Sequence, residues 1–152
     1  RVDLGGRRII KKIRLRQPMI NFEEINKKLN QADRFCAFNS MRLTGIGECR
    51  AEAEYDVSED SLNGHDVVQG GAIYTLCDFA FAGASWSTGR PCIGLNSTIS
   101  YLRPGKGPKI TATATLIHNG RTTCVCEAVA RNSDGKIIAK CTLTGYFLDQ
   151  KK

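Results

Sequence analysis

The chain has 152 residues, of which 41% are hydrophobic. This length and composition suit one domain with a single core and exclude a second full domain. The formal net charge is +7, but residues 1–16 carry seven basic side chains and one acidic side chain, so residues 17–152 carry only +1. A nearly neutral body does not favour nucleic acid as a partner. The longest apolar stretch, residues 72–86, contains Asp78 and is shorter than the ~18 residues that cross a membrane, so we expect no membrane association.

Residues 1–16 form a basic tail without the apolar region of a secretory signal. The chain does not begin with Met, and we expect residues 1–12 to be partly vector-derived, with a native basic tail as the alternative. Residues 17–152 are expected to form a single domain.

Seven cysteines are scattered through apolar or alternating runs. Small disulfide-bonded secreted domains space their cysteines differently, so we expect a reducing, cytoplasmic location. Cys124 and Cys126 share one side of a predicted strand but lack a second ligand pair at metal spacing. Buried thiols are therefore favoured over a zinc site, and we expect no metal and no cofactor.

The first predicted element is a short amphipathic helix over residues 21–30, which has apolar residues at helical spacing. Residues 40–57 contain two alternating runs on either side of residues 44–47, which predicts a β-hairpin with its turn there and one solvated face. A polar connector follows, residues 58–66.

Residues 67–88 contain two adjacent glycines at positions 70 and 71, followed by a run almost free of charge. The run is too long for a strand and hydrophobic around most of its circumference, which predicts a helix enclosed by the core. Four segments rich in Thr, Ile, Val and Cys follow, separated by turn dipeptides, and predict strands over residues 91–103, 109–118, 121–132 and 136–148. This order predicts an α+β domain in which a four-strand meander completes an antiparallel sheet curled around one helix.

Several motifs of this chain resemble the acyl-CoA thioesterases of phenylacetate degradation, over about residues 35–148. The segments that carry the resemblance are Leu62-Asn63-Gly64-His65, Gln69-Gly70-Gly71, Leu76, Asp78 with Phe79-Ala80-Phe81-Ala82, Tyr101-Leu102-Arg103-Pro104-Gly105 and Asn119-Gly120-Arg121. Many members have His where this chain has Gln69. The resemblance implies the hot-dog fold, a curved antiparallel sheet around a long central helix. It also implies an acyl-CoA substrate, with an aromatic acyl group favoured, and a homodimer or homotetramer with active sites at the subunit interface.

Thioester hydrolysis needs hydrogen-bond donors for the carbonyl oxygen and a base or nucleophile. Gly70 and Gly71 begin the long helix, where N–H groups lack partners, so they are candidates for the donors; their alternative role is to ease a turn. Asp78 lies in an apolar helix that should raise its basicity, which suits a general base or nucleophile; the alternative is a carboxylate on a solvated helix edge. The resemblance implies that Asp78 is the catalytic acid and that Asn63 orients the water or carbonyl, against a plain turn role for Asn63.

Five further residues are assigned to substrate binding: Gln69, His65, Asn96, Arg103 and Arg121. Asn96 lies on the polar side of a predicted strand, and the two arginines belong to a group of cations able to meet coenzyme A phosphates. The other members of that group are Arg90, Lys106 and Lys109.

Two other functions stay open at this level. A hot-dog dehydratase or hydratase would use His65 and Asp78 as a proton-transferring pair, and a non-catalytic acyl-CoA-binding protein would keep the fold without turnover. For a thioesterase, the spacing along the predicted helix limits how the site can be assembled. Gly70 and Asp78 are eight residues apart, or ~12 Å along a helix axis, too far to act on one thioester centre. We therefore expect two chains to share each site.

Overall fold

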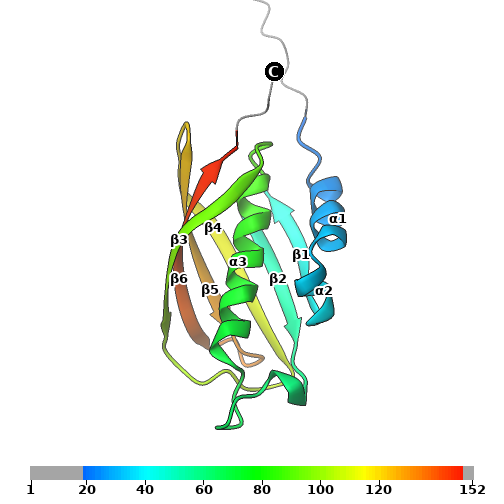
Figure 1. Cartoon of the computed structure of the whole chain (residues 1–152), viewed down its shortest axis with the longest axis vertical. Helices are drawn as coiled ribbons and strands as arrows, with labels where there is room; N and C mark the ends of the chain where they lie inside the picture. Colours follow the sequence, from blue (N-terminus) through cyan, green and yellow to red (C-terminus); the bar gives the residue numbers. More distant parts are fainter. Residues whose placement is uncertain (1–18, 149–152) are drawn as a thin grey trace, which may run out of the picture.

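The computed structural model describes residues 19–148, and Figure 1 shows one curved sheet around a central helix. The basic tail predicted for residues 1–16 lies outside the described residues. None of the described helices has the length and apolarity needed to cross a membrane. The elements in chain order are α1 (Phe22–Ala32), α2 (Arg34–Phe38), β1 (Met41–Gly47), β2 (Arg50–Asp56), η1 (Glu59–Ser61), α3 (Gly70–Trp86), β3 (Cys92–Tyr101), β4 (Lys109–Asn119), β5 (Thr123–Arg131) and β6 (Ile137–Phe147).

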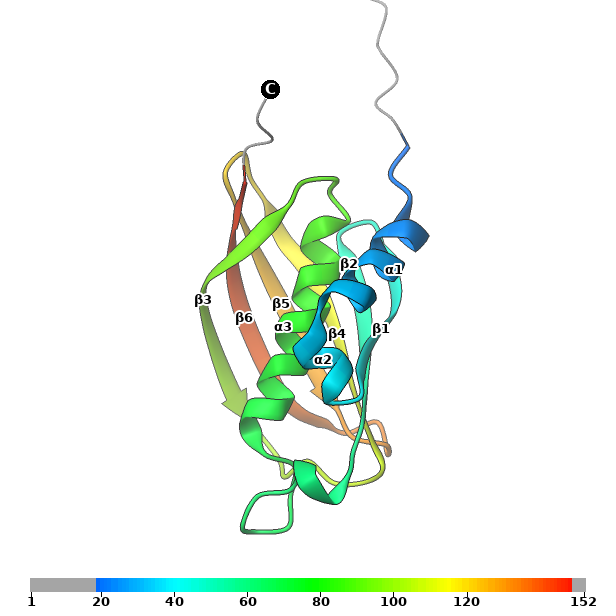
Figure 2. The ribbon, with the colours of Figure 1, turned by 45° about the vertical axis from the view of Figure 1, so that its right-hand side comes forward.

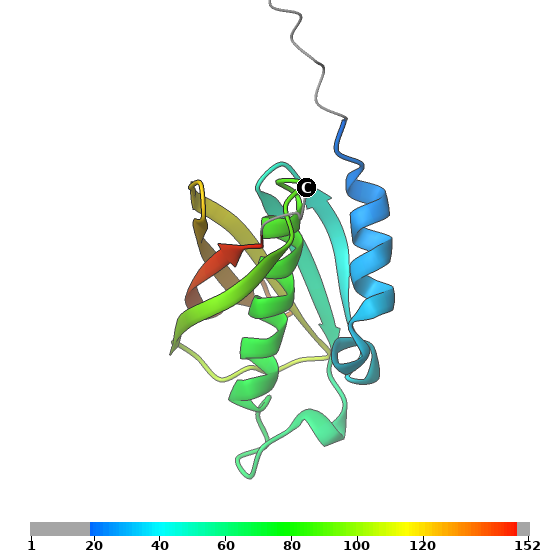
Figure 3. The same cartoon turned by 45° about the horizontal axis from the view of Figure 1, so that its top comes forward.

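The central helix α3 packs on the concave face of the sheet (Figures 1 and 3). It can approach the sheet closely because small side chains line the contact: a Cβ added to Gly83 would lie 2.7 Å from the Cβ of Ala51. Leu76 and Ala80 are fully buried, whereas Gly71 and Asp78 are exposed. The expectation that the core encloses the helix is therefore wrong for the single chain, in which one stripe of α3 stays open.

All strand pairs are antiparallel, in the order β1-β2-β4-β5-β6-β3. The α+β prediction of an antiparallel sheet around one helix is confirmed, but the four-strand meander is wrong. Only β4, β5 and β6 form a meander, while β3 pairs with β6 at the far edge. The reason is that residues 102–108 cross the foot of α3 instead of closing a hairpin (Figure 1). Within this crossing, the Gly105 carbonyl accepts a hydrogen bond from the Val68 N–H at 2.9 Å.

The hairpin predicted over residues 40–57 is present, but its turn is not at residues 44–47. β1 continues through Gly47, and the chain reverses at Glu48 and Cys49, where Cys49 takes a φ of +56°. Gly45 instead marks a shift in the register of β1 against β2. A strand can absorb such a bulge without ending, which is why the glycines there misled the turn prediction.

Two helices lie beside the β1 side of α3 (Figure 2). α1 is capped by the Asn21 side chain and corresponds to the amphipathic helix predicted from the sequence. α2 was not predicted, because its five residues are too few for a periodic pattern. The side chain of Asp33 caps α2 by accepting a hydrogen bond from the Cys36 N–H at 2.9 Å.

Candidate active site

The first turn of α3 leaves one N–H group open. Gln69 is the N-cap, and its side-chain oxygen accepts hydrogen bonds from the N–H groups of Gly71 and Ala72. The backbone oxygen of Gln69 accepts from Ala72 and Ile73, at 3.0 and 3.3 Å. Among residues 19–148, no acceptor engages the Gly70 N–H. The expectation that both glycines offer free donors is therefore narrowed to Gly70.

Tyr101 fixes the position of Gly70 from β3. Its hydroxyl donates a hydrogen bond to the Gly70 carbonyl at 2.8 Å, and a Cβ added to Gly70 would lie 3.1 Å from the tyrosine ring. Next to this contact is a hollow of about 330 Å³, which we call the Arg103 hollow. Asn63, Gly70, Tyr101 and Arg103 are among the residues that line it. The fold thus brings together three of the predicted site residues at the N-terminus of α3.

The side chain of Asn63 also stabilises the loop in which it lies. Its side-chain oxygen accepts the N–H of His65 at 2.9 Å, which is the turn geometry expected of Asn-Gly sequences. The amide nitrogen of Asn63 has no hydrogen-bond partner among the described residues and can donate to a ligand. His65 itself is exposed in this loop.

Asp78 lies two turns along α3, in a separate hollow of about 310 Å³ between α3 and β3, the Asp78 hollow. Asn96 lines the same hollow, together with the pair formed by Tyr74 and Ser97, whose oxygens are 2.6 Å apart. A carboxylate oxygen of Asp78 would lie 4.0 Å from a Cβ added to Gly94. The register of β3 against β6 shifts between Gly94 and Asn96, so the strand bulges where it faces Asp78.

The local environment makes Asp78 more basic. Asp78 is exposed in the single chain, but it lines the hollow between α3 and β3, where protein atoms replace part of its solvent. This desolvation, with a smaller effect from the negative charge of Asp33, raises the pKa of Asp78 above its ordinary value of 3.8. A carboxylate with a raised pKa is a better proton acceptor, as a general base requires.

Several predicted cations are already engaged within the chain. Arg90 donates to the carbonyls of Gly120 and Arg121 and lies over the Phe147 ring, and Lys109 pairs with Glu54 at 2.8 Å. Arg121 is in the β4–β5 hairpin, at the end of the molecule where α3 terminates (Figure 1). Within one chain it is therefore remote from Gly70. Arg103 lines the hollow beside Gly70 and donates a hydrogen bond to the Ile137 carbonyl at 2.8 Å.

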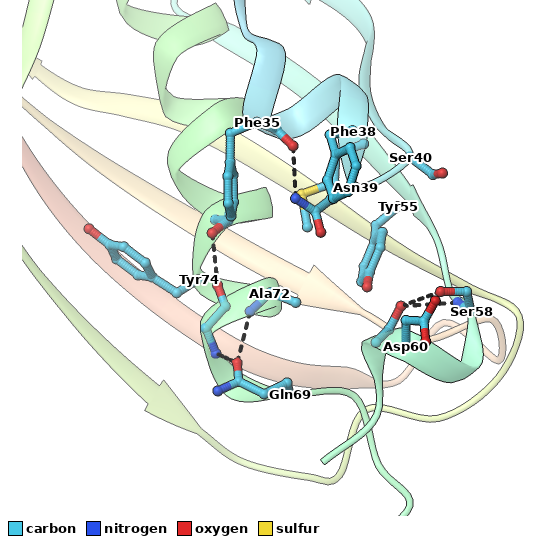
Figure 4. Close-up of a pocket in the computed structure, with 14 residues that line it drawn as sticks. Phe35, Phe38, Asn39, Ser40, Tyr55, Ser58, Asp60, Gln69, Ala72 and Tyr74 are labelled. Atoms are coloured by element: carbon cyan, nitrogen blue, oxygen red, sulfur yellow. Dashed lines mark hydrogen bonds between the residues drawn. The ribbon is translucent and has the colours of Figure 1, made fainter.

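Sequence reasoning missed part of these surroundings. Tyr101 belongs to one of the motifs of the resemblance but had no predicted role, and Phe35 and Phe38 lie in α2, which the sequence did not predict (Figure 4). The exposed fractions of Phe35 and Phe38, 63% and 88%, make them stand out in the structure. No periodic signal in the sequence marks them, because α2 has only five residues.

Gly70 and Asp78 line different hollows, the Arg103 hollow and the Asp78 hollow. The two groups lie on α3 with two helical turns between them, as the spacing predicted. Residues 19–148 also hold no group of three His, Cys, Asp or Glu side chains arranged to bind a metal ion.

Comparison with known proteins identifies the family. Residues 65–139 match the family model of the thioesterase superfamily. The chain is also 39% identical to the acyl-coenzyme A thioesterase PaaI of Escherichia coli over 98 residues, which cover 64% of this chain and 70% of that protein. The chain belongs to the thioesterase superfamily. As a member of it, the protein is a thioester hydrolase, as the sequence predicted.

Solved structures support this membership of the thioesterase superfamily. The E. coli PaaI protein from the phenylacetic acid degradation operon superposes with a TM-score of 0.81 at 27% identity, covering 86% of this chain and 95% of that one. A thioesterase from Streptococcus pneumoniae, solved with coenzyme A, superposes with a TM-score of 0.74 at 29% identity, covering 83% of this chain and 98% of that one. The predicted hot-dog fold is therefore confirmed.

Proposed function

We propose that this protein hydrolyses acyl-CoA thioesters, with Asp78 as the base or nucleophile and the Gly70 N–H as the donor to the thioester carbonyl. The observation that carries the proposal is the pairing of a carboxylate of raised pKa with one open N–H group at the start of the same helix. The match to a relative named as an acyl-CoA thioesterase, and the coenzyme A bound in the S. pneumoniae structure, support CoA as the thiol.

The general-base route is chemically complete with these groups. Asp78 takes a proton from a water molecule as the water oxygen attacks the thioester carbon. The carbonyl electrons move to oxygen, where the Gly70 N–H and the positive end of the α3 dipole stabilise the charge. On collapse the C–S bond breaks, and the departing sulfur takes the proton from Asp78. The free acid and coenzyme A are the products.

In the nucleophile route, the Asp78 carboxylate attacks the thioester carbon and expels the thiolate to leave a mixed anhydride. Water then hydrolyses this anhydride. After a single turnover in H₂¹⁸O, label in the Asp78 side chain would identify the nucleophile route with water attack on the aspartyl carbon, because the base route cannot label that side chain. Attack of water on the acyl carbon of the anhydride leaves the side chain unlabelled, and trapping the anhydride with hydroxylamine then identifies the nucleophile route.

We propose that each site is shared by two subunits of a homodimer, which can pair into a tetramer. The separation of Gly70 from Asp78 within one chain supports this arrangement. The edge strand β3 supports it further, because it runs beside Asp78 and exposes Ile93 and Leu95 by 48% and 58%. An unpaired edge strand with exposed apolar residues favours pairing with another chain. Asn63, Asn96 and Arg103 would then line the shared site, with Arg103 toward coenzyme A.

We also propose a reducing compartment such as the cytoplasm. All seven cysteines are free thiols, and Cys92 and Cys124 stay unbonded with their sulfurs 3.7 Å apart. Free thiols at this separation favour a compartment that keeps cysteines reduced.

The alternative reaction, hydration of a carbon–carbon double bond, has less support. It would need His65 in the site as the partner of Asp78 in proton transfer, but His65 is exposed in its loop and lines neither the Arg103 hollow nor the Asp78 hollow. Incubating the protein with acetyl-, octanoyl-, benzoyl- and phenylacetyl-CoA and measuring released thiol tests the proposal. We expect release from at least one aromatic thioester and loss of most of it in Asp78→Asn. Near-wild-type release by that variant would contradict the role of Asp78.

A further inference from the structure

Two cysteines of different strands meet over a glycine of the strand between them. Cys92 begins β3 and Cys124 lies in β5, with β6 in between. Strands two places apart in a sheet are roughly 10 Å apart, and side chains of the strand between them usually keep their side chains from meeting. Here that position of β6 is Gly145, and a Cβ added to it would lie 2.5 Å from the Cys92 sulfur and 3.0 Å from the Cys124 sulfur. The missing side chain lets the two sulfurs approach to 3.7 Å.

The surroundings of the pair make Cys92 the more acidic thiol. A hydrogen bond from the Cys124 thiol stabilises the Cys92 thiolate and lowers the pKa of Cys92 below its ordinary value of 9.0. The Ser85 hydroxyl and the positive charge of Arg90 shift this pKa in the same direction, against the effect of burial. The pKa of Cys124 is raised, because its hydrogen bond to Cys92 favours the protonated thiol. The other five cysteines also have raised pKa values, mainly because they are buried, so Cys92 is the thiol best able to ionise.

Cys92 is also the accessible member of the pair. It is half-buried, whereas Cys124 is fully buried. A small neutral oxidant such as hydrogen peroxide therefore meets Cys92 first, and the Cys124 thiol is already in contact with the sulfur that has reacted. An accessible thiol of lowered pKa next to a second thiol is the arrangement found in redox-sensing cysteines.

We propose that Cys92 and Cys124 form a peroxide-sensitive modification site that closes to a disulfide. The Cys92 sulfur attacks one peroxide oxygen, the O–O bond breaks, and the other oxygen leaves as hydroxide, which becomes water with the proton that Cys92 has released. The Cys124 sulfur then attacks the sulfenic acid formed at Cys92, the S–O bond breaks, and hydroxide leaves as water with the Cys124 proton. Two thiols are thus oxidised to one disulfide while hydrogen peroxide is reduced to two molecules of water.

Closing this bond moves β3, because the sulfurs must come from 3.7 Å to a bond length of about 2.05 Å. Among the described strands, β3 is at the edge and pairs with β6 alone, so its start can be drawn toward β5. Gly94, two residues further along β3, lines the Asp78 hollow. The bond therefore displaces one wall of that hollow, and oxidation lowers thioester hydrolysis until a reductant restores the thiols. This effect on hydrolysis rests on the proposed function, whereas formation of the bond does not.

The test treats the reduced full chain with hydrogen peroxide, removes the peroxide, and measures free thiols and mass. We expect the wild type to lose two of its seven thiols and the mass of two hydrogen atoms, and to regain both with dithiothreitol. Peptide mapping should find the bond between Cys92 and Cys124. In Cys92→Ser, thiol loss should slow at least about tenfold. In Cys124→Ala, dimedone should label Cys92, because its sulfenic acid has lost its partner.

Cys49→Ser is the matched control, because Cys49 is the other half-buried cysteine and its thiol is not part of the pair. The Cys92–Cys124 bond should form in this variant as in the wild type. If peroxide leaves the wild type with no Cys92–Cys124 bond, or if Cys92→Ser loses thiols as fast as the wild type, the proposed site is wrong. These readouts use the wild type and a half-buried position, so they stand even if Cys124→Ala does not fold.

Hydrolysis before and after oxidation is followed by the ultraviolet absorbance of the thioester bond, since a thiol reagent would also react with the protein. We expect the oxidised wild type to lose most of its activity and to regain it with dithiothreitol, while Cys92→Ser keeps its own activity through the same treatment. A disulfide form with full activity would overturn the link to the Asp78 hollow. A reduced wild type that hydrolyses no thioester would refute the proposed function, and the thiol count and mass would still decide whether the disulfide forms.

Discussion

Gly70 carries the open N–H at the start of α3, so a substitution of this residue tests directly whether that N–H is the donor to the thioester carbonyl. Proline removes this N–H yet is well accepted at the first position of a helix. The preceding residue, Gln69, has φ −59° and ψ 133°, a conformation that proline also accepts in its neighbour. We expect Gly70→Pro to fold and to lose about 10²- to 10³-fold in kcat, the usual effect of removing one such donor.

The matched control is Gly70→Ala. It adds the same Cβ beside Tyr101, 3.1 Å from the ring, but keeps the N–H group. Its kcat should stay within about tenfold of wild type, and circular dichroism should show both variants folded. Equal losses in the two variants would mean that the contact with Tyr101, and not the N–H, is what matters at this position.

Asp78 has opposite effects on activity and stability. Its pKa is higher in the folded chain than in the unfolded chain, so the folded state binds the proton more tightly. The free energy of unfolding therefore decreases as pH rises from about 3.8 to the raised pKa, and stays lower above it. We expect Asp78→Asn to increase the melting temperature at pH 7 while abolishing most activity. Thermal melts of the wild type and of Asp78→Asn at pH 4 and pH 7 check this, and a melting temperature of Asp78→Asn below that of the wild type at pH 7 would contradict the desolvation argument.

The same ionisation should shape the activity profile. If Asp78 must be deprotonated to act, kcat/KM falls as pH drops through its raised pKa. We expect the acidic limb of the wild-type profile to lie above pH 3.8, the ordinary carboxyl value. Replacing Asp33, whose charge contributes to the shift, by Asn should move that limb to lower pH. If the acidic limb does not move in Asp33→Asn, the charge of Asp33 does not influence the ionisation of Asp78.

At the scale of elements, the close contact between α3 and the sheet sets a limit on helix composition. Alanine has a helix propensity ~1 kcal/mol better than glycine. However, a Cβ on Gly83 would lie 2.7 Å from the Cβ of Ala51, and an alanine side chain has no rotamer by which it could move away. Overpacking of this kind costs ~1–3 kcal/mol. We expect Gly83→Ala to lower the free energy of unfolding in urea. Ala82→Gly, one residue earlier, measures the propensity effect together with the loss of one half-buried methyl group that packs against the core. A stabilised Gly83→Ala would show that the helix can shift.

The elements also show what the sequence can and cannot reveal. Local patterns are sufficient for α3 and for the positions of β4, β5 and β6, because charge-free runs and turn dipeptides mark them. The partner of β3 depends on which way the connection after it crosses α3, and no local pattern encodes that. The spacing of Gly70 and Asp78 can be read from the sequence. The cap formed by Gln69 and the exposed phenylalanines of α2 cannot, because they depend on side-chain directions at one loop and one very short helix.

At the scale of the whole molecule, a shared site predicts complementation between inactive variants. Gly70→Pro damages the donor and Asp78→Ala damages the carboxylate. In a mixed dimer both lesions fall in one site and the other site is intact. We expect co-refolded variants to recover part of the wild-type thiol release, while each variant refolded alone stays inactive. If labelled subunits demonstrably exchange and activity does not return, Gly70 and Asp78 do not meet across an interface.

The position of β3 has a consequence for the order of folding. Its partner in the sheet is β6, the last strand of the chain, so β3 has no template until the β4–β5–β6 meander exists. Pairing over such a long sequence separation is slow compared with hairpin formation. The seam between β3 and α3, which holds Asp78, therefore closes late. A refolding chain should acquire most of its strand structure before it acquires any catalytic activity.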